Sequence, residues 1–429
     1  MTLCIPDKEL AILIDRWIEY DSNTNTRAFI AGLKEKNSWD VLESLMRPRI
    51  SFGTAGLRAE MGAGFARMND LTVMQTSQGL ASYVKKHTAK EEPVAVIGYD
   101  HRANSKTFSR ITTEAFLKKG FKVFLFPDII PTPLLAFSVL QLKADIGVMI
   151  TASHNPKSDN GYKVYWSNGA QILAPHDANI LCSIQANLEP WSALPSALDK
   201  TFVPDTLCAY LSSITSILSV KTAPKSVPRV VYTAMHGVGY QTVKASVKAC
   251  GFPELFPVKS QVDPDPEFPT APKPNPEEAG AFDEAFKTAK DVGATVIFSN
   301  DPDADRFSLA EELSDGKWRI FTGDEVGIIL ASYLVEEGLF RETPNIAVLN
   351  TVVSSSLLGK MASNWSAEYA HRKFKYAQCL TGFKNIVHSA QRLMNQGYNV
   401  ALAYEEALGY MCTTNVMDKD GISALMNAC

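Results

Sequence analysis

Between residues 70 and 151 the sequence alternates helical patterns with short apolar runs, and no other feature limits the possible fold as strongly. Helical periodicity and apolar runs that take turns along a chain are typical of βαβ units. Such units build a parallel or mixed sheet that is covered by helices. The sequence therefore predicts an α/β fold. We expect helices over 26–46, over 71–87, over 105–119 and from Thr132, and strands over 94–100, 122–126 and 146–150.

A serine, Ser153, follows the last of these apolar runs in the stretch Thr-Ala-Ser-His-Asn-Pro. Loops that leave strand ends hold the catalytic side chains of many α/β proteins. Pro156 restricts the residue before it to extended backbone, and Asp-Asn-Gly at 159–161 predicts a tight turn. Lys163 is then expected to return beside Ser153 as a proton carrier. Taken alone, these residues are more typical of an ordinary strand, polar turn and strand.

Three aspartates form a second candidate site. Asp301, Asp303 and Asp305 follow an apolar run at alternate positions, so in extended backbone their carboxylates point to one side and can share a hard cation. The same spacing begins a calcium-binding EF-hand loop. That alternative fails because Arg306 stands where the EF-hand turn requires glycine, and because Pro302 interrupts the loop.

Glycines and arginines are interleaved between residues 51 and 67. Such glycines let backbone N–H groups approach an anion, and Arg58 or Arg67 can bind its oxygens in pairs. Glycine-rich turns are common, so this segment alone is a weak indication of an anion site. The glycines concerned are Gly53, Gly56, Gly62 and Gly64, with Gly79 in the helix that follows.

The composition excludes several classes of protein. A formal net charge of -4 over 429 residues gives no electrostatic reason to expect nucleic acid or an anionic membrane as partner. The seven cysteines are scattered without a C-x-x-C pair, which argues against disulfides or zinc and favours the reducing cytoplasm. The amphipathic N-terminal segment carries too many charges for a signal peptide, and no run is long enough to span a membrane. The sequence carries no indication of oligomeric state.

Four motifs, in order along the chain, resemble those of the α-D-phosphohexomutase superfamily, and within it the phosphoglucomutase and phosphopentomutase branch. The resemblance implies a phosphohexomutase fold, with consecutive α/β domains, each a mixed sheet flanked by helices, around a central cleft. It also implies that Ser153 carries the transferred phosphate and that Arg58 reaches it. The motifs are GTAGLR at 53–58, TASHNP with NGYK at 151–163, NDPDADR at 300–306 and EEALGY at 405–410.

The resemblance also implies the cofactors and the remaining site residues. Magnesium would be held by the three aspartates together with Ser153, and Lys163 would be the general acid and base, for which an ammonium beside other cations is suited. His154 is the alternative proton shuttle, or else a structural hydrogen-bond partner in the serine loop. Ala407 replaces a serine of many hexose-phosphate mutases. The substrate-binding candidates are Arg102, Arg306, Lys384, Glu405, Glu406 and Lys419.

Three domains are expected, at 1–225, 226–323 and 324–429, with proline- and serine-rich linkers near 194–204 and 219–228. The proline-rich stretch 263–278 is expected to form neither helix nor strand. A plain surface loop and a loop with a role in the reaction are equally good interpretations of it. The superfamily's fourth domain, with its R-T-S-G-T-E-P-type phosphate loop, has no counterpart, so a truncated form is expected.

The predicted function is intramolecular phosphoryl transfer on sugar phosphates through a phosphoserine. The substrates would be glucose 1- and 6-phosphate, or ribose or deoxyribose 1- and 5-phosphate, and a sugar 1,6- or 1,5-bisphosphate would be intermediate and activator. Two alternatives stay open: a glucose 1,6-bisphosphate synthase, or a phosphosugar-binding chain that is catalytically impaired because the fourth domain is missing.

Overall fold

The alternating pattern folds into mixed sheets flanked by helices. The computed structural model describes residues 7–53, 56–191, 205–218 and 228–429. Contacts group the chain into two units. Unit 1 comprises 1–128, 143–166 and 172–203, and unit 2 comprises 129–142, 167–171 and 204–429.

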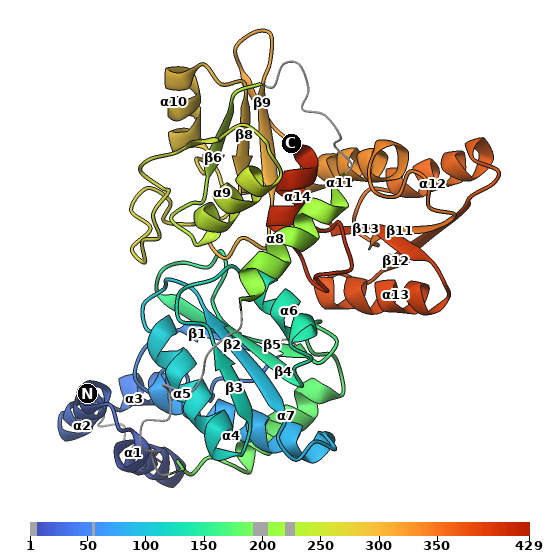
Figure 1. Ribbon diagram of the computed structural model, residues 1–429. Helices are drawn as coiled ribbons and strands as arrows, with labels where there is room; N and C mark the ends of the chain where they lie inside the picture. The colour runs from blue at the N-terminus through green and yellow to red at the C-terminus, as the bar shows by residue number, and fades with distance from the viewer. Residues whose placement is uncertain (1–6, 54–55, 192–204, 219–227) are drawn as a thin grey trace. The chain divides into compact units, whose positions relative to one another are not determined.

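Unit 1 contains a five-stranded sheet in the order β1-β5-β4-β2-β3 (Figure 1). Strands β3, β2 and β4 run parallel, while β5 is antiparallel to both β4 and β1, so the predicted mixed sheet is confirmed. The elements of this unit are α1 (Lys8–Tyr20), α2 (Thr24–Glu35), α3 (Trp39–Met46), β1 (Gly56–Glu60), α4 (Asp70–His87), β2 (Val94–Tyr99), α5 (Ser105–Lys118), β3 (Lys122–Leu125), β4 (Ile146–Ile150), β5 (Asp159–Trp166) and α7 (His176–Gln185).

Helix α4 is buried between α5 and α7, and the core of unit 1 lies between these helices and the strands. Gly79 makes the contact with α7 possible, because a Cβ atom there would lie 2.4 Å from the Cα atom of Ile184. This glycine therefore serves helix packing rather than the anion binding that its place after the glycine-rich segment suggested.

We expect Gly79→Ala to lower the free energy of unfolding by about 1–3 kcal/mol, because the added methyl group forces α4 and α7 apart. Gly32→Ala in α2 is the matched control: no atom lies within 4 Å of its Cβ position, and alanine is the better helix former, so stability should rise by up to about 1 kcal/mol. Urea unfolding followed by circular dichroism measures both. Equal effects of the two substitutions would contradict the packing role of Gly79.

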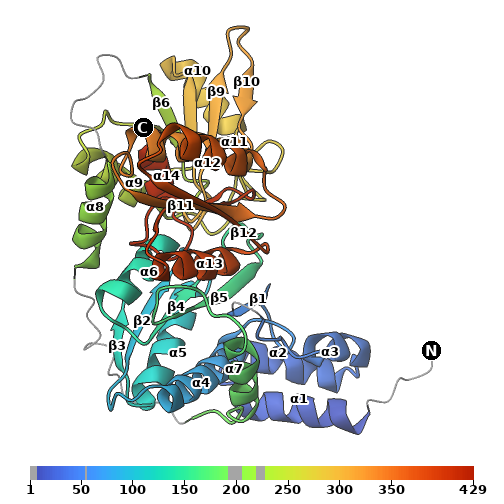
Figure 2. The ribbon, with the colours of Figure 1, turned by 90° about the vertical axis from the view of Figure 1, so that its right-hand side faces the viewer.

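Helices α1, α2 and α3 pack on one another at the N-terminal side of unit 1 (Figure 2). Their shared core includes Ile14, Trp17 and Phe65. The sequence favoured one helix over 26–46, but two are present, since Asn37 adopts a left-handed conformation with φ of 53°. A residue in that conformation ends a right-handed helix.

Unit 2 contains two sheets, ordered β10-β9-β8-β6-β7 and β12-β11-β13-β14. Its elements in the first half are α6 (Thr132–Gln141), α8 (Thr206–Ile217), β6 (Val230–Thr233), α9 (Gly239–Ala249), β7 (Phe256–Pro257), α10 (Asp283–Val292), β8 (Val296–Ser299), β9 (Ser308–Glu312) and β10 (Trp318–Ile320). Those in the second half are α11 (Gly323–Ser332), the π-helical segment η2 (Tyr333–Glu337), β11 (Asn345–Thr351), α12 (Leu357–Glu368), β12 (Lys373–Cys379), α13 (Phe383–Asn395), β13 (Asn399–Glu405), β14 (Gly409–Met411) and α14 (Gly421–Ala428).

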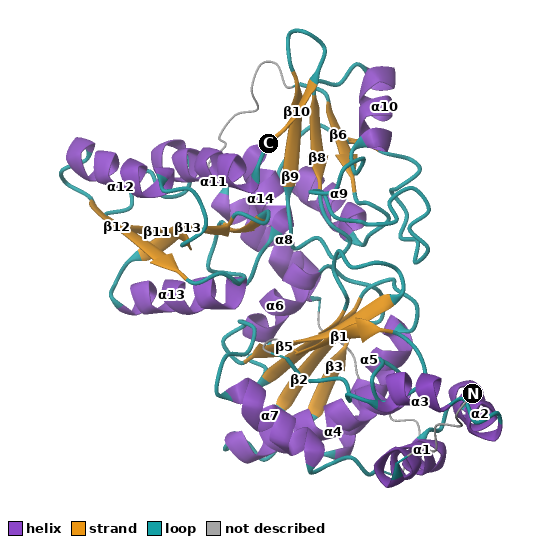
Figure 3. Cartoon of the chain, turned by 180° about the vertical axis from the view of Figure 1, so that it is seen from behind, coloured by secondary structure: helices purple, strands orange, loops and turns teal. Residues whose placement is uncertain are grey.

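The second of these sheets lies between helices on both faces. Figures 1 and 3 show α13 on one face and α11 with α12 on the other. The apolar side of α13, including Phe383 and Val387, packs against Leu349 and Ala403 of the strands. Helix α14 is buried and contacts α9, α11 and β14. Its first turn is capped by Asp420, whose carboxylate also accepts a hydrogen bond of 2.8 Å from Tyr210.

The stretch 263–278 forms neither helix nor strand, as predicted, although Phe268 within it is buried. The predicted linkers, and the boundary at 225, fall largely outside the described residues, so the three domain ranges stay predictions. No helix in the described parts of the chain has the length and apolar character needed to cross a membrane.

Candidate active site

Ser153 lies in the loop between β4 and β5 and is buried in a left-handed backbone conformation with φ of 54°. Serine rarely adopts this conformation, and such strain persists only where surrounding contacts impose it. The backbone N–H of Ser153 donates to Thr151 Oγ1 at 2.9 Å. Its Oγ atom lies 3.2 Å from Nδ1 of His154, the hydrogen bond that the structural interpretation of this histidine expects.

Arg102 holds the serine loop in place. This buried guanidinium donates to the carbonyl oxygens of Ser153 and Asn155, at 2.5 and 2.6 Å. Two further carbonyls, of Pro156 and Asp159, accept hydrogen bonds of 2.8 and 3.2 Å. The carboxylate of Asp100 lies 3.4 Å from Nε of Arg102. These contacts position the loop, and the predicted contact of Arg102 with substrate stays a prediction.

We expect Arg102→Lys to slow phosphorylation of Ser153 by about tenfold to a hundredfold, since one ammonium cannot serve four carbonyls and charge-assisted hydrogen bonds contribute about 1.5–3 kcal/mol each. Quantitative mass spectrometry of Ser153 after rapid mixing with glucose 1,6-bisphosphate measures this rate. Arg110→Lys, on the exposed side of α5, is the control and should match the parent. A parent-like rate in Arg102→Lys would contradict the positioning role.

Strand β1 brings Arg58 next to this loop. Arg58 pairs in register with Gly161 of β5, and its Nη1 atom donates to the side-chain oxygen of Asn155 at 3.0 Å. The expectation of a turn at 159–161 is wrong, because these residues begin β5 and pair with β1. The reversal occurs earlier in the loop and still returns Lys163, which is buried and pairs with Met149 of β4.

Gly56 in the glycine-rich segment has a packing role. Its φ is 135°, and a Cβ atom would lie 1.7 Å from the carbonyl oxygen of Tyr162 in β5. Only glycine lets β1 approach β5 this closely. This close approach places Arg58 in register beside the serine loop, so the glycine supports the candidate site indirectly.

The three aspartates of unit 2 converge as predicted. Asp301, Asp303 and Asp305 are buried, and one carboxylate oxygen from each lies within 4.8 Å of the others. The extended backbone that was predicted from the sequence is not what brings the three carboxylates together. The loop after β8 turns sharply at Ala304, whose φ is 57° and whose N–H donates to the carbonyl of Asp301 at 2.9 Å.

Contacts from elsewhere in unit 2 fix this loop. The hydroxyl of Thr132, at the start of α6, donates to Asp303 Oδ2 at 2.6 Å, and its N–H donates to the carbonyl of the same residue at 2.9 Å. Asn300 donates to the carbonyl of Arg306 at 2.6 Å. No sequence pattern links Thr132 to this site, because it lies 171 residues from Asp303 along the chain.

The electrostatics of the triad fit a hard divalent cation. Burial, followed by the neighbouring charges of Asp303 and Asp305, raises the pKa of Asp301 well above its usual range. Three buried carboxylates repel one another unless a cation or protons neutralise them. Their oxygens are the ligands that Mg²⁺ or Ca²⁺ prefers, and no softer donor joins the described cluster.

Two cations of unit 2 lie beside the triad. Nζ of Lys419 is 3.3 Å from Asp305 Oδ2 and 3.5 Å from Asp418. Arg306 follows the triad directly, and its Nη1 atom lies 3.4 Å from Glu277. Both side chains are largely buried, so their charges act in a medium where electrostatic interactions are strong.

The two glutamates after β13 differ in environment. Glu405 is mostly buried, and burial raises its pKa although Lys419 and Arg306 act in the opposite direction. Glu406 accepts hydrogen bonds from Thr351 at 2.7 Å and Ser354 at 2.9 Å, so it braces the loop after β11.

Lys384 lies in the stretch TGFK at 381–384, which predicts a turn, but it is the second residue of α13, which begins at Phe383. Gly382, two residues before it, adopts φ of 93°, so the turn ends two residues earlier than this stretch indicates.

The predicted site residues thus form two groups. Unit 1 holds the serine loop with its arginines, lysine and histidine, and unit 2 holds the triad, Arg306, Lys384, the glutamates and Lys419. Ser153 as a metal ligand and the assigned roles of the other residues stay predictions.

Three models of known protein domains match this chain and identify its family. Models of phosphoglucomutase/phosphomannomutase alpha/beta/alpha domains I, II and III match residues 49–190, 208–315 and 322–429. The chain belongs to the phosphoglucomutase/phosphomannomutase family. This membership confirms the resemblance stated from the four motifs and the fold of consecutive α/β domains.

Individual proteins that are similar to this chain carry names from the same family. A phosphoribomutase of Saccharomyces cerevisiae is 44% identical over 439 residues, which cover 96% of this chain and 69% of that protein. A human glucose 1,6-bisphosphate synthase is 36% identical over 97% of this chain and 70% of its own length. A crystal structure of a phosphoglucomutase/phosphomannomutase family protein from Burkholderia thailandensis has the same fold, with a TM-score of 0.69, 20% identity, and coverage of 87% of this chain and 75% of that one.

Proposed function

We propose that this protein is a sugar-phosphate mutase that moves a phosphoryl group between two hydroxyls of a sugar through a phosphoserine at Ser153. The observation that carries the proposal is the serine loop. A buried serine with φ of 54°, held by an arginine that bonds four loop carbonyls, has a fixed hydroxyl at a strand end. Fixed geometry of this kind is what phosphoryl transfer requires of a protein, since its catalysis rests on positioning and charge stabilisation.

The proposed cycle has two transfers. In the first, the hydroxyl oxygen of a sugar monophosphate attacks the phosphorus on Ser153, the bond between phosphorus and Oγ breaks, and a sugar bisphosphate forms. The attacking hydroxyl gives its proton to the neutral amine of Lys163, and the leaving Oγ takes up that proton. The bisphosphate then turns over. In the second transfer, Oγ returns its proton to Lys163 and attacks the other phosphate, and the released sugar oxygen takes the proton from Lys163. Atoms and charge balance, and the serine is phosphorylated again.

Each group of side chains has a task in this cycle. A magnesium ion on Asp301, Asp303 and Asp305 would neutralise charge that develops on the transferred phosphoryl group. Arg58 and Arg306 would bind phosphate oxygens, and Lys163 would move the proton. Glu405, whose charge interacts with those of Lys419 and Arg306, would accept hydrogen bonds from sugar hydroxyls. Lys384 and Lys419 would contact the second phosphate.

We propose pentose 1- and 5-phosphates as substrates, because the yeast phosphoribomutase shares 44% of aligned residues with this chain. Formation of glucose 1,6-bisphosphate is the second candidate, favoured by the human synthase at 36% identity. A sugar bisphosphate would serve as the activator in either case. We place the reaction in the cytoplasm because the described cysteines are all free thiols.

The test is to incubate the protein with magnesium and a trace of glucose 1,6-bisphosphate, and to follow ribose 1-phosphate and glucose 1-phosphate by phosphorus NMR. A mutase converts ribose 1-phosphate to ribose 5-phosphate without net bisphosphate. Net accumulation of bisphosphate would favour the synthase. Binding of sugar phosphate with no phosphate on Ser153 and no conversion would favour a binding protein and contradict the proposal.

A further inference from the structure

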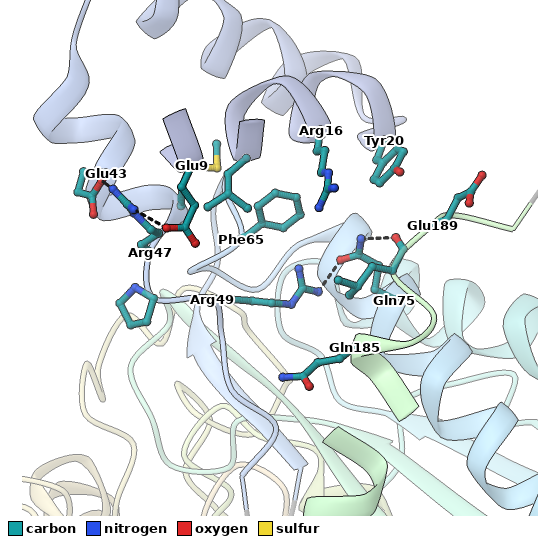
Figure 4. A pocket seen from close by; sticks show the side chains of 14 residues that line it. Glu9, Arg16, Tyr20, Glu43, Arg47, Arg49, Phe65, Gln75, Gln185 and Glu189 are labelled. Atoms are coloured by element: carbon teal, nitrogen blue, oxygen red, sulfur yellow. Dashed lines mark hydrogen bonds and ion pairs between the residues drawn. The ribbon is translucent and has the colours of Figure 1, made fainter. Parts of the chain in front are cut away.

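Unit 1 contains a cavity of about 830 Å³ that the proposed reaction does not use. Figure 4 shows it between α1, the end of α3, Phe65, and the segment that follows α7. None of the candidate site residues lines it. Helices α1 and α3 precede residue 49, where the first family match begins.

Arg49 supplies the charge inside the cavity. Its Nη2 atom donates to Gln75 Oε1 at 2.5 Å, and its guanidinium carbon lies 5.1 Å from the centre of the Phe65 ring. No described carboxylate lies within 4.0 Å of it. Burial lowers the pKa of Arg49 to about 10, so the side chain keeps its charge at neutral pH.

The acidic side chains at the cavity edge do not neutralise this charge. Arg47 already pairs with Asp7 at 2.9 Å and Glu9 at 3.5 Å, and it contacts Glu43 even more closely. The other lining acid, Glu189, is exposed. A half-buried cation with only a neutral amide as side-chain hydrogen-bond partner gains from an anionic ligand.

The remaining lining defines what else the ligand carries. Leu13, Met46, Phe65 and Leu188 give the cavity an apolar wall, against which the hydroxyls of a bare sugar would lose their hydrogen bonds. An aromatic ring can pack against the same wall without losing hydrogen bonds. Gln185 at the rim is exposed and offers both a donor and an acceptor for the polar edge of a heterocycle (Figure 4).

We propose that this cavity binds a phosphomonoester of the nucleoside monophosphate class, with the phosphate on Arg49 and the planar base against the apolar wall. The volume is in the range of about 300–1,000 Å³ that is usual for small-molecule sites. Arg16, which also lines the cavity and has no described carboxylate within 4.0 Å, adds positive charge at the entrance. The ligand would be an effector rather than a substrate.

Isothermal titration calorimetry with AMP, adenosine and inorganic phosphate tests the assignment. We expect AMP to bind at least about tenfold more tightly than either fragment, because only AMP meets both the arginine and the apolar wall. Arg49→Gln should reduce AMP affinity to that of adenosine. Arg27→Gln, an exposed arginine of α2 outside the cavity, should leave it unchanged.

Leu13→Trp provides an independent variant, because its larger side chain obstructs the apolar wall without altering Arg49, and it should also weaken AMP binding. Saturating glucose 1,6-bisphosphate should not displace AMP, which separates this site from the proposed active site. The proposal is overturned if AMP binds no better than adenosine, if both variants bind it like the parent, or if the bisphosphate displaces it.

Discussion

Ser153→Ala should abolish phosphoryl transfer and leave the fold intact. The hydroxyl is the proposed covalent carrier, so without it neither half of the cycle takes place, and the rate should fall by at least about four orders of magnitude. The side chain lies in a loop at a strand end, and its removal opens no cavity in the apolar core. Phosphorus NMR of ribose 1-phosphate conversion measures the rate, and circular dichroism checks the fold.

Ser158→Ala is the matched control. This serine lies in the same loop and is exposed, and its hydroxyl donates to Asp159 at 3.0 Å, so loss of the hydroxyl should not change the rate appreciably. Conversion by Ser153→Ala at more than a hundredth of the parent rate would rule out Ser153 as the phosphate carrier.

Asp303→Asn should weaken magnesium binding by at least about tenfold and lower the rate by about two orders of magnitude, since a charged ligand becomes a neutral amide. The hydrogen bond from Thr132 can still reach the amide oxygen, so the loop should keep its shape. Without magnesium the variant should melt at a higher temperature than the parent, because one of three mutually repelling buried charges is gone.

Thermal unfolding with and without magnesium gives a readout that does not depend on activity. Asp291→Asn on the exposed side of α10 is the control and should keep the parent's magnesium dependence. The metal assignment would be wrong if Asp303→Asn and the parent were stabilised equally by magnesium.

The sequence predicted the elements well because strand and helix patterns are local. Strands β2, β3 and β4 and helices α4 and α5 begin and end within two residues of the expected positions. The errors came from backbone conformations that composition does not reveal. Asn37 breaks a helix that periodicity favoured, and the Asp-Asn-Gly stretch at 159–161 pairs with β1 instead of forming a turn.

In the candidate site, too, local motifs could be predicted from the sequence and long-range contacts could not. Ser153 and the aspartate triad could be found from short motifs, but the reason that the carboxylates converge could not, because it depends on a left-handed residue at Ala304 and on Thr132 far away in the sequence. Likewise, the hydrogen bonds by which Arg102 holds the serine loop could not be predicted from the sequence. Long-range hydrogen bonds of this kind leave no local pattern.

The most direct test of the account is a single-turnover experiment with glucose 1,6-bisphosphate labelled with ³²P. The account predicts that label appears on the peptide containing Ser153, and that added ribose 5-phosphate discharges it to the sugar at least as fast as the steady-state turnover. Label on another residue, or a phosphoserine that is discharged more slowly than turnover, would contradict it.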